Sequence, residues 1–201
     1  MICKQLLIGP MDVFSYVVGC KETGQGAVID PGGEDERILQ AAEEQGLNLL
    51  YIINTHHHFD HTEGNDWLKE RTGADIVMHE ADAALYDRHV DHVIREEGPF
   101  RLGSLTFSVY HTPGHTPGGI CLYAQGTLFT GDTLFVGDSG RTDLPGGHRP
   151  TLGASIRKLM QLPPETVVCP GHDYGPTSTS TLEWEQRHNV NAREYGFLKK
   201  S

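Results

Sequence analysis

Four histidines and one aspartate lie within seven residues of this chain, between positions 55 and 61. Imidazole and carboxylate groups are the ligands that zinc, iron and manganese accept at neutral pH. Residues 49–54, directly before them, form a short apolar segment of the kind that becomes a buried strand. A loop that follows such a strand is held by a rigid scaffold and can present reactive side chains. The segment therefore predicts a metal site at the end of a strand.

Three further motifs place a polar side chain after an apolar segment and a tight turn. His115 lies in a glycine- and proline-rich turn, and Asp132 and His172 each come just after a predicted strand. A single histidine in such a place is usually structural, but four motifs with one layout argue against coincidence. We therefore expect separate strand ends to deliver these side chains to one edge of a sheet sandwich.

Predicted strands and helices interleave throughout the chain, which fits sheets flanked by helices in a single domain over residues 1–201. Strands are expected over residues 11–20, 26–30, 49–54, 74–79, 105–110, 119–124, 127–130 and 166–169. Helices are expected over residues 34–45, 64–72, 81–86, 150–162 and 183–195. Residues 87–97 are polar and predict no regular element.

The composition argues against two classes of partner. Lys and Arg number 16 against 27 Asp and Glu, and the net charge of −11 leaves no basic face for nucleic acid. No apolar run is long enough to cross a membrane, and the first residues lack the apolar segment of a signal peptide. We therefore expect a cytoplasmic protein. The four cysteines are scattered without a CxxC pair and are expected to be reduced.

These motifs together resemble those of the metallo-β-lactamase superfamily, and within it the type II glyoxalase (hydroxyacylglutathione hydrolase) group. The resemblance rests on residues 55–61, 111–119, 129–135 and 171–174. It implies an α/β fold, the αββα metallo-β-lactamase sandwich, in which two mixed sheets are flanked by helices. It also implies two divalent metal ions at one sheet edge, zinc in the first place, with iron or manganese as alternatives.

The resemblance also implies which side chains hold the metals. It assigns His56, His58 and His115 to a first metal, Asp60, His61 and His172 to a second, and Asp132 to a bridge between them. Alternate residues of an extended loop point the same way, so His56, His58 and Asp60 can converge while His57 points elsewhere. Three or four protein ligands per metal leave room for water, as catalytic metal sites do.

The chemistry expected of this site is thioester hydrolysis. A metal ion lowers the pKa of bound water to about 7, so a metal-bound hydroxide is the expected nucleophile, with Asp60 and Asp132 as catalytic residues beside it. In the glyoxalases, residues at the positions of Arg141 and Tyr174 bind the glutathione part of the substrate. The other interpretation of Arg141 is a surface ion pair with Asp143 or Asp138.

The identity of the thiol carrier stays open at this stage. The sequence ends soon after its last predicted helix, so we expect it to lack the extra helical domain of full-length type II glyoxalases. We therefore expect a small-molecule thioester or thiol substrate, S-D-lactoylglutathione being one candidate. A homodimer is compatible with the resemblance.

A second activity is compatible with the same motifs. Persulfide dioxygenases resemble glyoxalases here but use one iron, held at the positions of His56, His115 and Asp132. Two histidines and one carboxylate with open positions suit a non-haem iron oxygenase. Ser139 and Leu144 stand where those enzymes commonly have Cys and Phe, so we favour the hydrolase. A non-catalytic protein that only kept the fold would be expected to have lost some ligands, and none is missing.

Four further polar residues near these motifs are expected to lie outside the set of metal ligands. Asp30 ends a predicted strand, where it forms a turn or orients a ligand histidine. His57 and His111 are expected not to bind metal, and His111 is expected to support its turn. His79 follows a strand and is expected at the rim of the site or at the start of a helix.

Overall fold

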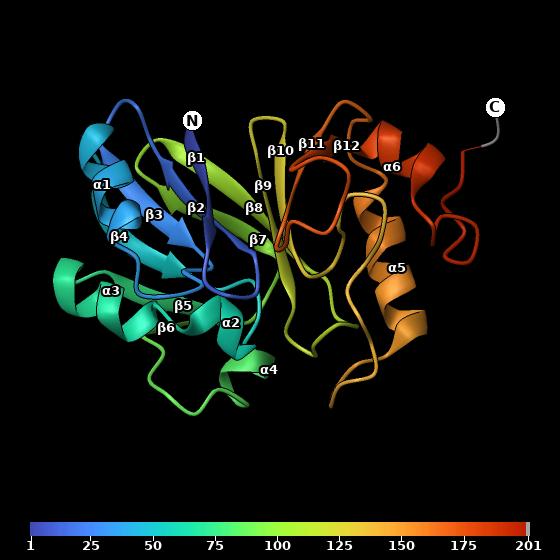
Figure 1. The fold of residues 1–201 in the computed structure, drawn as a ribbon, viewed down its shortest axis with the longest axis horizontal. Helices are drawn as coiled ribbons and strands as arrows, with labels where there is room; N and C mark the ends of the chain where they lie inside the picture. The colour runs from blue at the N-terminus through green and yellow to red at the C-terminus, as the bar shows by residue number, and fades with distance from the viewer. Residues whose placement is uncertain (200–201) are drawn as a thin grey trace.

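The structure is a computed structural model that describes residues 1–199; Lys200 and Ser201, the end of the predicted domain, lie outside the described residues. Two six-stranded sheets lie side by side, with helices on their outer faces (Figure 1). The first sheet has the order β1 (Ile2–Ile8), β2 (Val13–Gly19), β3 (Gln25–Ile29), β4 (Asn48–Ile53), β5 (Asp75–His79) and β6 (His92–Ile94). The second has the order β12 (Ser180–Thr181), β11 (Val167–Pro170), β10 (Thr127–Gly131), β9 (Ile120–Ala124), β8 (Leu105–His111) and β7 (Gly98–Leu102).

Both sheets are mixed. In the first sheet, β3, β4, β5 and β6 pair in parallel, whereas β1, β2 and β3 pair antiparallel. In the second, β10 and β11 are parallel and the other neighbours are antiparallel. The predicted fold class of two mixed sheets flanked by helices is confirmed.

The hydrophobic core fills the space between the two sheets. Strand β8 shows the cause in its sequence, because Leu105, Phe107 and Val109 are buried while the residues between them are exposed. Phe107 packs with Phe129 from β10 and with residues of the first sheet in one cluster. The Tyr16 hydroxyl donates a hydrogen bond of 2.7 Å to the Pro170 carbonyl, which links the two sheets within this core.

Helices close the outer face of each sheet. Helices α1 (Glu36–Glu44) and α3 (Asn65–Thr72) cover the first sheet, where Ile38 and Leu68 pack on strand residues such as Ile52. Helices α5 (Arg149–Leu159) and α6 (Leu182–His188) cover the second, where Ile156 packs against Val168. The short helices α2 (Phe59–Thr62) and α4 (Glu80–Ala83) directly follow the ligand-rich loop and β5.

The predicted elements differ from the structure mainly at the sheet edges. Strands β1, β6, β7 and β12 were not predicted, and each except β6 and β12 is a five- to seven-residue strand. Strand β1 is mostly half-buried or exposed, so its sequence lacks the alternation of apolar and polar residues that predicts a strand. Strand β7 begins with Gly98-Pro99, a pair that is typical of a turn. The helix predicted over 183–195 is wrong beyond His188, because Asn189 adopts an extended conformation.

The topology brings the ligand-bearing loops to one edge. Parallel strands have their carboxyl ends on the same side of a sheet, so the loops after β3, β4 and β5 begin together. The loops after β10 and β11 begin together for the same reason. No helix within residues 1–199 is long and apolar enough to cross a membrane.

Candidate metal centre

The first group of converging side chains consists of His56, His58 and His115. One ring nitrogen of each lies within 4.8 Å of the others. The Nε2 atom of His115 is 3.0 Å from Nδ1 of His58, while the buried Nε2 atom of His56 has no hydrogen-bond partner. A buried polar atom without a partner is rare and costly, and a metal ion that accepts the lone pair of this nitrogen would satisfy it.

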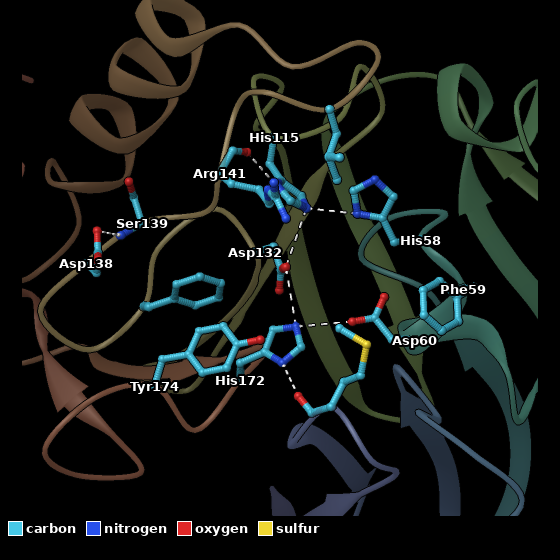
Figure 2. Close-up of a pocket in the computed structure, with 13 residues that line it drawn as sticks. His58, Phe59, Asp60, His115, Asp132, Asp138, Ser139, Arg141, His172 and Tyr174 are labelled. Atoms are coloured by element: carbon cyan, nitrogen blue, oxygen red, sulfur yellow. Dashed lines mark hydrogen bonds and ion pairs between the residues drawn. The ribbon is translucent and has the colours of Figure 1, made fainter.

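The second group consists of Asp60, His61 and His172, whose ligand atoms also lie within 4.8 Å of one another. The Nε2 atoms of His61 and His172 are 3.1 Å apart, and Nε2 of His172 is 3.4 Å from Oδ2 of Asp60. Helix α2 supplies Asp60 and His61 from its first turn, whereas His172 comes from the turn after β11. Figure 2 shows His172 facing Asp60 across the floor of a pocket.

Asp132 lies between the two groups. Its Oδ1 atom is 3.2 Å from Nε2 of His61, and its Oδ2 atom is 3.4 Å from Nε2 of His115 and 3.5 Å from Nε2 of His172. The structure thus brings all seven predicted ligands to one sheet edge. A set of imidazoles and carboxylates at these separations fits divalent metal ions.

Two histidines of the first group have a lowered pKa. Burial lowers the pKa of His56 well below its ordinary value, and the neighbouring imidazole of His61 acts in the same direction. Burial together with the rings of His115 and His57 lowers the pKa of His58 to about 4. The lone pairs of His56 and His58 are therefore free of protons at neutral pH.

The second group holds protons instead. Burial opposes a charge on His61, but the carboxylates of Asp132 and Asp30 outweigh it and raise the pKa of His61 well above its ordinary value. Burial also opposes a charge on His172, yet contacts with Asp132 and Asp60 raise its pKa to about 9. The same imidazoles hold the pKa of both ligand carboxylates below the ordinary value despite their burial. A metal ion must displace protons to bind here.

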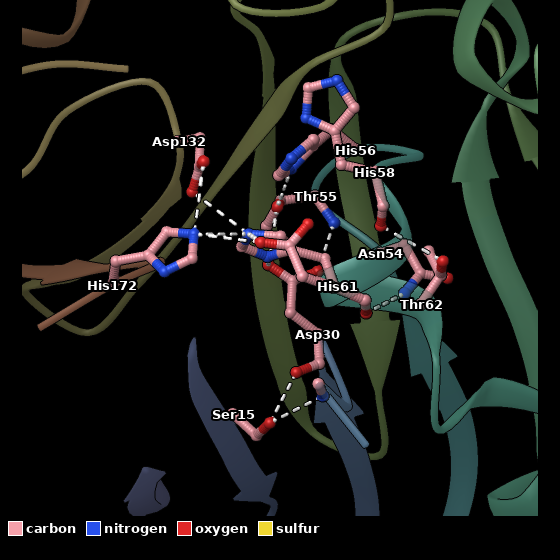
Figure 3. Close-up of polar contacts among 12 residues, drawn as sticks. Ser15, Asp30, Asn54, Thr55, His56, His58, His61, Thr62, Asp132 and His172 are labelled. Carbon is pink, nitrogen blue, oxygen red and sulfur yellow. Dashed lines mark hydrogen bonds and ion pairs between the residues drawn. The ribbon is translucent and has the colours of Figure 1, made fainter. Parts of the chain in front are cut away.

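Asp30 orients one ligand of the second group. It accepts hydrogen bonds from the Thr55 amide (2.7 Å) and the Thr55 hydroxyl (2.6 Å), and its Oδ2 atom is 3.0 Å from Nδ1 of His61 (Figure 3). The contact turns Nε2 of His61 toward the centre. Asp30 also has a positive φ of 49° at the end of β3, so both interpretations of this residue hold. Because its oxygens are engaged by Thr55 and His61, we do not count Asp30 as a ligand.

Main-chain carbonyls orient two further ligands. Nδ1 of His115 donates to the carbonyl of Arg141 at 2.7 Å, and Nδ1 of His172 donates to the carbonyl of Met11 at 2.9 Å. Each bond leaves Nε2 pointing at the centre. Neither contact was predicted, because a carbonyl can come from any residue and leaves no signal in the sequence.

The histidines expected not to bind metal lie outside both groups. Nδ1 of His57 is 3.0 Å from Oδ2 of Asp82, a fully buried carboxylate that the sequence analysis also missed. Nε2 of His111 donates to the Pro117 carbonyl at 2.9 Å and so supports its turn. His79 caps the start of α4 by accepting a hydrogen bond from the Ala81 amide.

A pocket of about 500 Å³ opens over the centre. Its wall is largely apolar and includes Phe59, Phe135 and Tyr174. Tyr174 stacks on the ring of His172, with centroids 4.5 Å apart (Figure 2). The Tyr174 residue is exposed to solvent. Arg141 also lines the pocket, but its guanidinium forms a two-bond pair with Asp143 at 2.7 Å each. The ion pair that was the alternative interpretation of Arg141 is present, with Asp143 as the partner, and substrate contacts of Arg141 and Tyr174 stay predictions.

Comparison with known proteins gives one consistent result. Residues 8–172 match the family described as the Metallo-beta-lactamase superfamily. A hydroxyacylglutathione hydrolase of Rhodospirillum rubrum is 39% identical over 89% of this chain and 70% of its own length. The mitochondrial persulfide dioxygenase ETHE1 of Mus musculus is 34% identical over 94% of this chain and 75% of its own length. The crystal structure of TTHA1623 in a di-iron-bound form superposes with a TM-score of 0.81 at 35% identity, covering 93% of this chain and 98% of that protein.

Proposed function

The chain belongs to the metallo-beta-lactamase superfamily, as its motifs indicate, and from this premise we propose that it is a metal-dependent hydrolase that cleaves small-molecule thioesters. The observation that carries the proposal is the completeness of both ligand groups. Three histidines form the first, one aspartate and two histidines form the second, and Asp132 contacts both. A two-metal hydrolase would use both groups, whereas a reaction at a single metal would not require the second.

The chain's own residues would bind the metals and shape the pocket. His56, His58 and His115 would hold one ion and Asp60, His61 and His172 the other, with Asp132 shared. Bound divalent ions supply Lewis acidity and an activated water at neutral pH. Asp60 and Asp132 have a pKa below the ordinary carboxyl value, so they hold cations and are not proton donors at neutral pH.

The shape of the pocket supports a small thioester as substrate. The cavity of about 500 Å³ reaches the ligand groups at its base, and its apolar wall of Phe59, Phe135 and Tyr174 suits the carbon atoms of an acyl group or thiol carrier. The 39% identical hydroxyacylglutathione hydrolase makes S-D-lactoylglutathione the first substrate to test.

Persulfide dioxygenation is the second candidate. It is favoured by the similarity to ETHE1 and by the geometry of His56, His115 and Asp132, two histidines and a carboxylate beside an open pocket. The two activities differ in their need for the second group, because a mononuclear oxygenase does not require His172.

One preparation of the protein can separate the two candidates. We expect about two metal ions per chain and release of free thiol from S-D-lactoylglutathione. His172→Ala should lower kcat/KM at least about 100-fold. Mutation of a residue that only orients a metal ligand already lowers metal affinity or activity about 10–100-fold, and loss of the ligand itself should cost more. The matched control is His89→Ala, an exposed histidine that contacts Asp91. One iron per chain, oxygen uptake with glutathione persulfide and an active His172→Ala variant would instead establish the dioxygenase.

A further inference from the structure

The geometry points to Asp82 as a positioning residue that holds the two chain segments of the first ligand group, His56 with His58 and His115, in register. The inference rests on the proposed metal centre and assigns a task to a carboxylate outside it. Asp82 lies in α4, which begins directly after β5.

Asp82 is fully buried and every contact of its carboxylate reaches one of these two segments. Its Oδ2 atom accepts a hydrogen bond from the His57 amide at 2.9 Å and lies 3.0 Å from the His57 ring. The same oxygen accepts a hydrogen bond of 2.8 Å from the Thr116 hydroxyl. Oδ1 accepts one of 2.5 Å from the Gly118 amide.

The donors are the immediate neighbours of the ligands. His57 lies between His56 and His58 in the loop after β4, and Thr116 directly follows His115 in the turn between β8 and β9. These two segments come from different sheets, and the first metal group forms only where they meet. A single carboxylate from a third segment therefore fixes the distance between the ligand loops.

Gly118 provides an independent observation for the same contact. A Cβ atom at position 118 would lie 2.5 Å from the Asp82 amide nitrogen and 2.6 Å from its Oδ1 atom. The need for glycine here is therefore space for the approach of Asp82. The backbone of the turn therefore lies closer to Asp82 than a residue with a Cβ atom would permit.

The burial of this charge also requires a reason. Burying a carboxylate is expensive, and an apolar side chain would satisfy the fold at lower cost. Burial by itself would raise the pKa of Asp82, but the His57 ring and the hydrogen bonds of Thr116 and Gly118 lower it below the ordinary value. The carboxylate stays ionised and keeps all its acceptor sites for the two loops.

The second group does not depend on Asp82. His61 is oriented by Asp30 and His172 by the Met11 carbonyl. Loss of Asp82 should therefore weaken metal binding at the first group and spare the second, whereas a general role in folding would affect both groups.

Variants that keep only one complete ligand group allow the metal affinity of each group to be measured separately. His172→Ala leaves the first group as the complete site, and His58→Ala leaves the second. Titration of the metal-free proteins with Co²⁺, followed by its visible absorption, gives the affinity of each group. Asp82→Asn should weaken binding about 10–100-fold in the His172→Ala background and less than about threefold in the His58→Ala background.

Two further variants guard against a folding artefact. Gly118→Ala removes no polar group but displaces Asp82, so it should reproduce the selective loss at the first group. Glu80→Ala is the matched control, an exposed residue of the same helix paired with Arg95, and should leave both affinities unchanged. Circular dichroism of the metal-free variants reports whether each one folds.

The outcomes separate failure of this inference from failure of the proposed function. Equal weakening of both groups by Asp82→Asn, or none at the first group, would overturn the positioning role while the hydrolase stands. If the unmodified chain takes up no Co²⁺, the metal centre and the inference that rests on it both fail.

Discussion

The two ligand groups share one edge and one aspartate but differ in charge. The first is made of three imidazoles, and burial lowers the pKa of His56 and holds that of His58 at about 4, so these two rings are uncharged at neutral pH. The second lies among carboxylates that raise the pKa of His172 to about 9, so it carries protons. Two groups at the same edge of one fold can therefore differ in how easily they bind a metal ion at neutral pH. The first group is prepared for a metal and the second must exchange protons for one.

The groups also differ in how their ligands are oriented. In the second, the Asp30 carboxylate turns the ring of His61, and the contact stays within the first sheet and its loops. In the first, the Arg141 carbonyl turns the ring of His115. Both groups combine ligands from the two sheets, with His115 from the second sheet in one group and His172 from it in the other. The groups therefore differ in the chemistry of the orienting partner, which is a carboxylate for His61 and a main-chain carbonyl for His115.

Removal of the shared aspartate should have the largest effect. Asp132→Ala withdraws the one carboxylate that contacts both groups, and losses of 10–100-fold at each should combine to roughly 1,000-fold in kcat/KM. The control is Asp138→Ala, which removes a carboxylate that lines the same pocket but belongs to neither group. Metal content measured on both variants tests the comparison, because loss of only one ion would place Asp132 in a single group.

The ligands could be predicted from sequence because their signals are local. The HxHxDH pattern packs four of them into one loop, and Asp132 and His172 each follow an apolar strand at a turn. Such patterns come from neighbours in the chain. The interleaved strands and helices likewise indicated sheets flanked by helices, whereas the αββα sandwich was implied by the family resemblance. The core strands β4, β8 and β10 were predicted from such local patterns.

The contacts that hold the ligands could not be predicted in this way. Met11 and Arg141 act through carbonyls, and any residue supplies a carbonyl. Asp82 lies in the helix expected over residues 81–86, where no local pattern marks it as a buried contact, and only the tertiary fold buries it. Edge strands such as β1 escape prediction because a strand paired on one side needs little burial.

The two groups should differ in how their affinity for a metal ion depends on pH. A raised pKa means that the proton is bound at neutral pH, so the second group should gain affinity at least about tenfold per pH unit up to the pKa of His172 near 9, and more if His61 also releases a proton. Between pH 6 and 8 this amounts to at least about 100-fold, whereas His58 of the first group should contribute little to the pH dependence because its pKa is about 4. Co²⁺ titrations of His58→Ala and His172→Ala measure the second and first groups in turn. Equal pH dependence of the two would refute the contrast in charge.

The smallest effect on activity is expected for Arg141, which lines the pocket but belongs to neither ligand group. Arg141 has two separate functions in the structure, since its carbonyl orients His115 and its exposed guanidinium pairs with exposed Asp143. Arg141→Ala keeps the carbonyl, so the metal content should not change, and loss of an exposed ion pair should hardly shift the melting temperature. KM for a glutathione thioester should rise about two- to fivefold, and KM for the uncharged thioester of N-acetylcysteamine should not.

The partner of Arg141 sharpens this last prediction. Asp143→Ala frees the guanidinium for a substrate carboxylate, because the pair that lowers the pKa of Asp143 to about 2 is then absent. KM for the glutathione thioester should therefore fall or stay constant in Asp143→Ala and rise in Arg141→Ala. If both variants raise KM for both thioesters alike, the pair acts by shaping the loop beside His115. A loss of metal in Arg141→Ala would mean that the side chain, and not the carbonyl alone, keeps the first group in place.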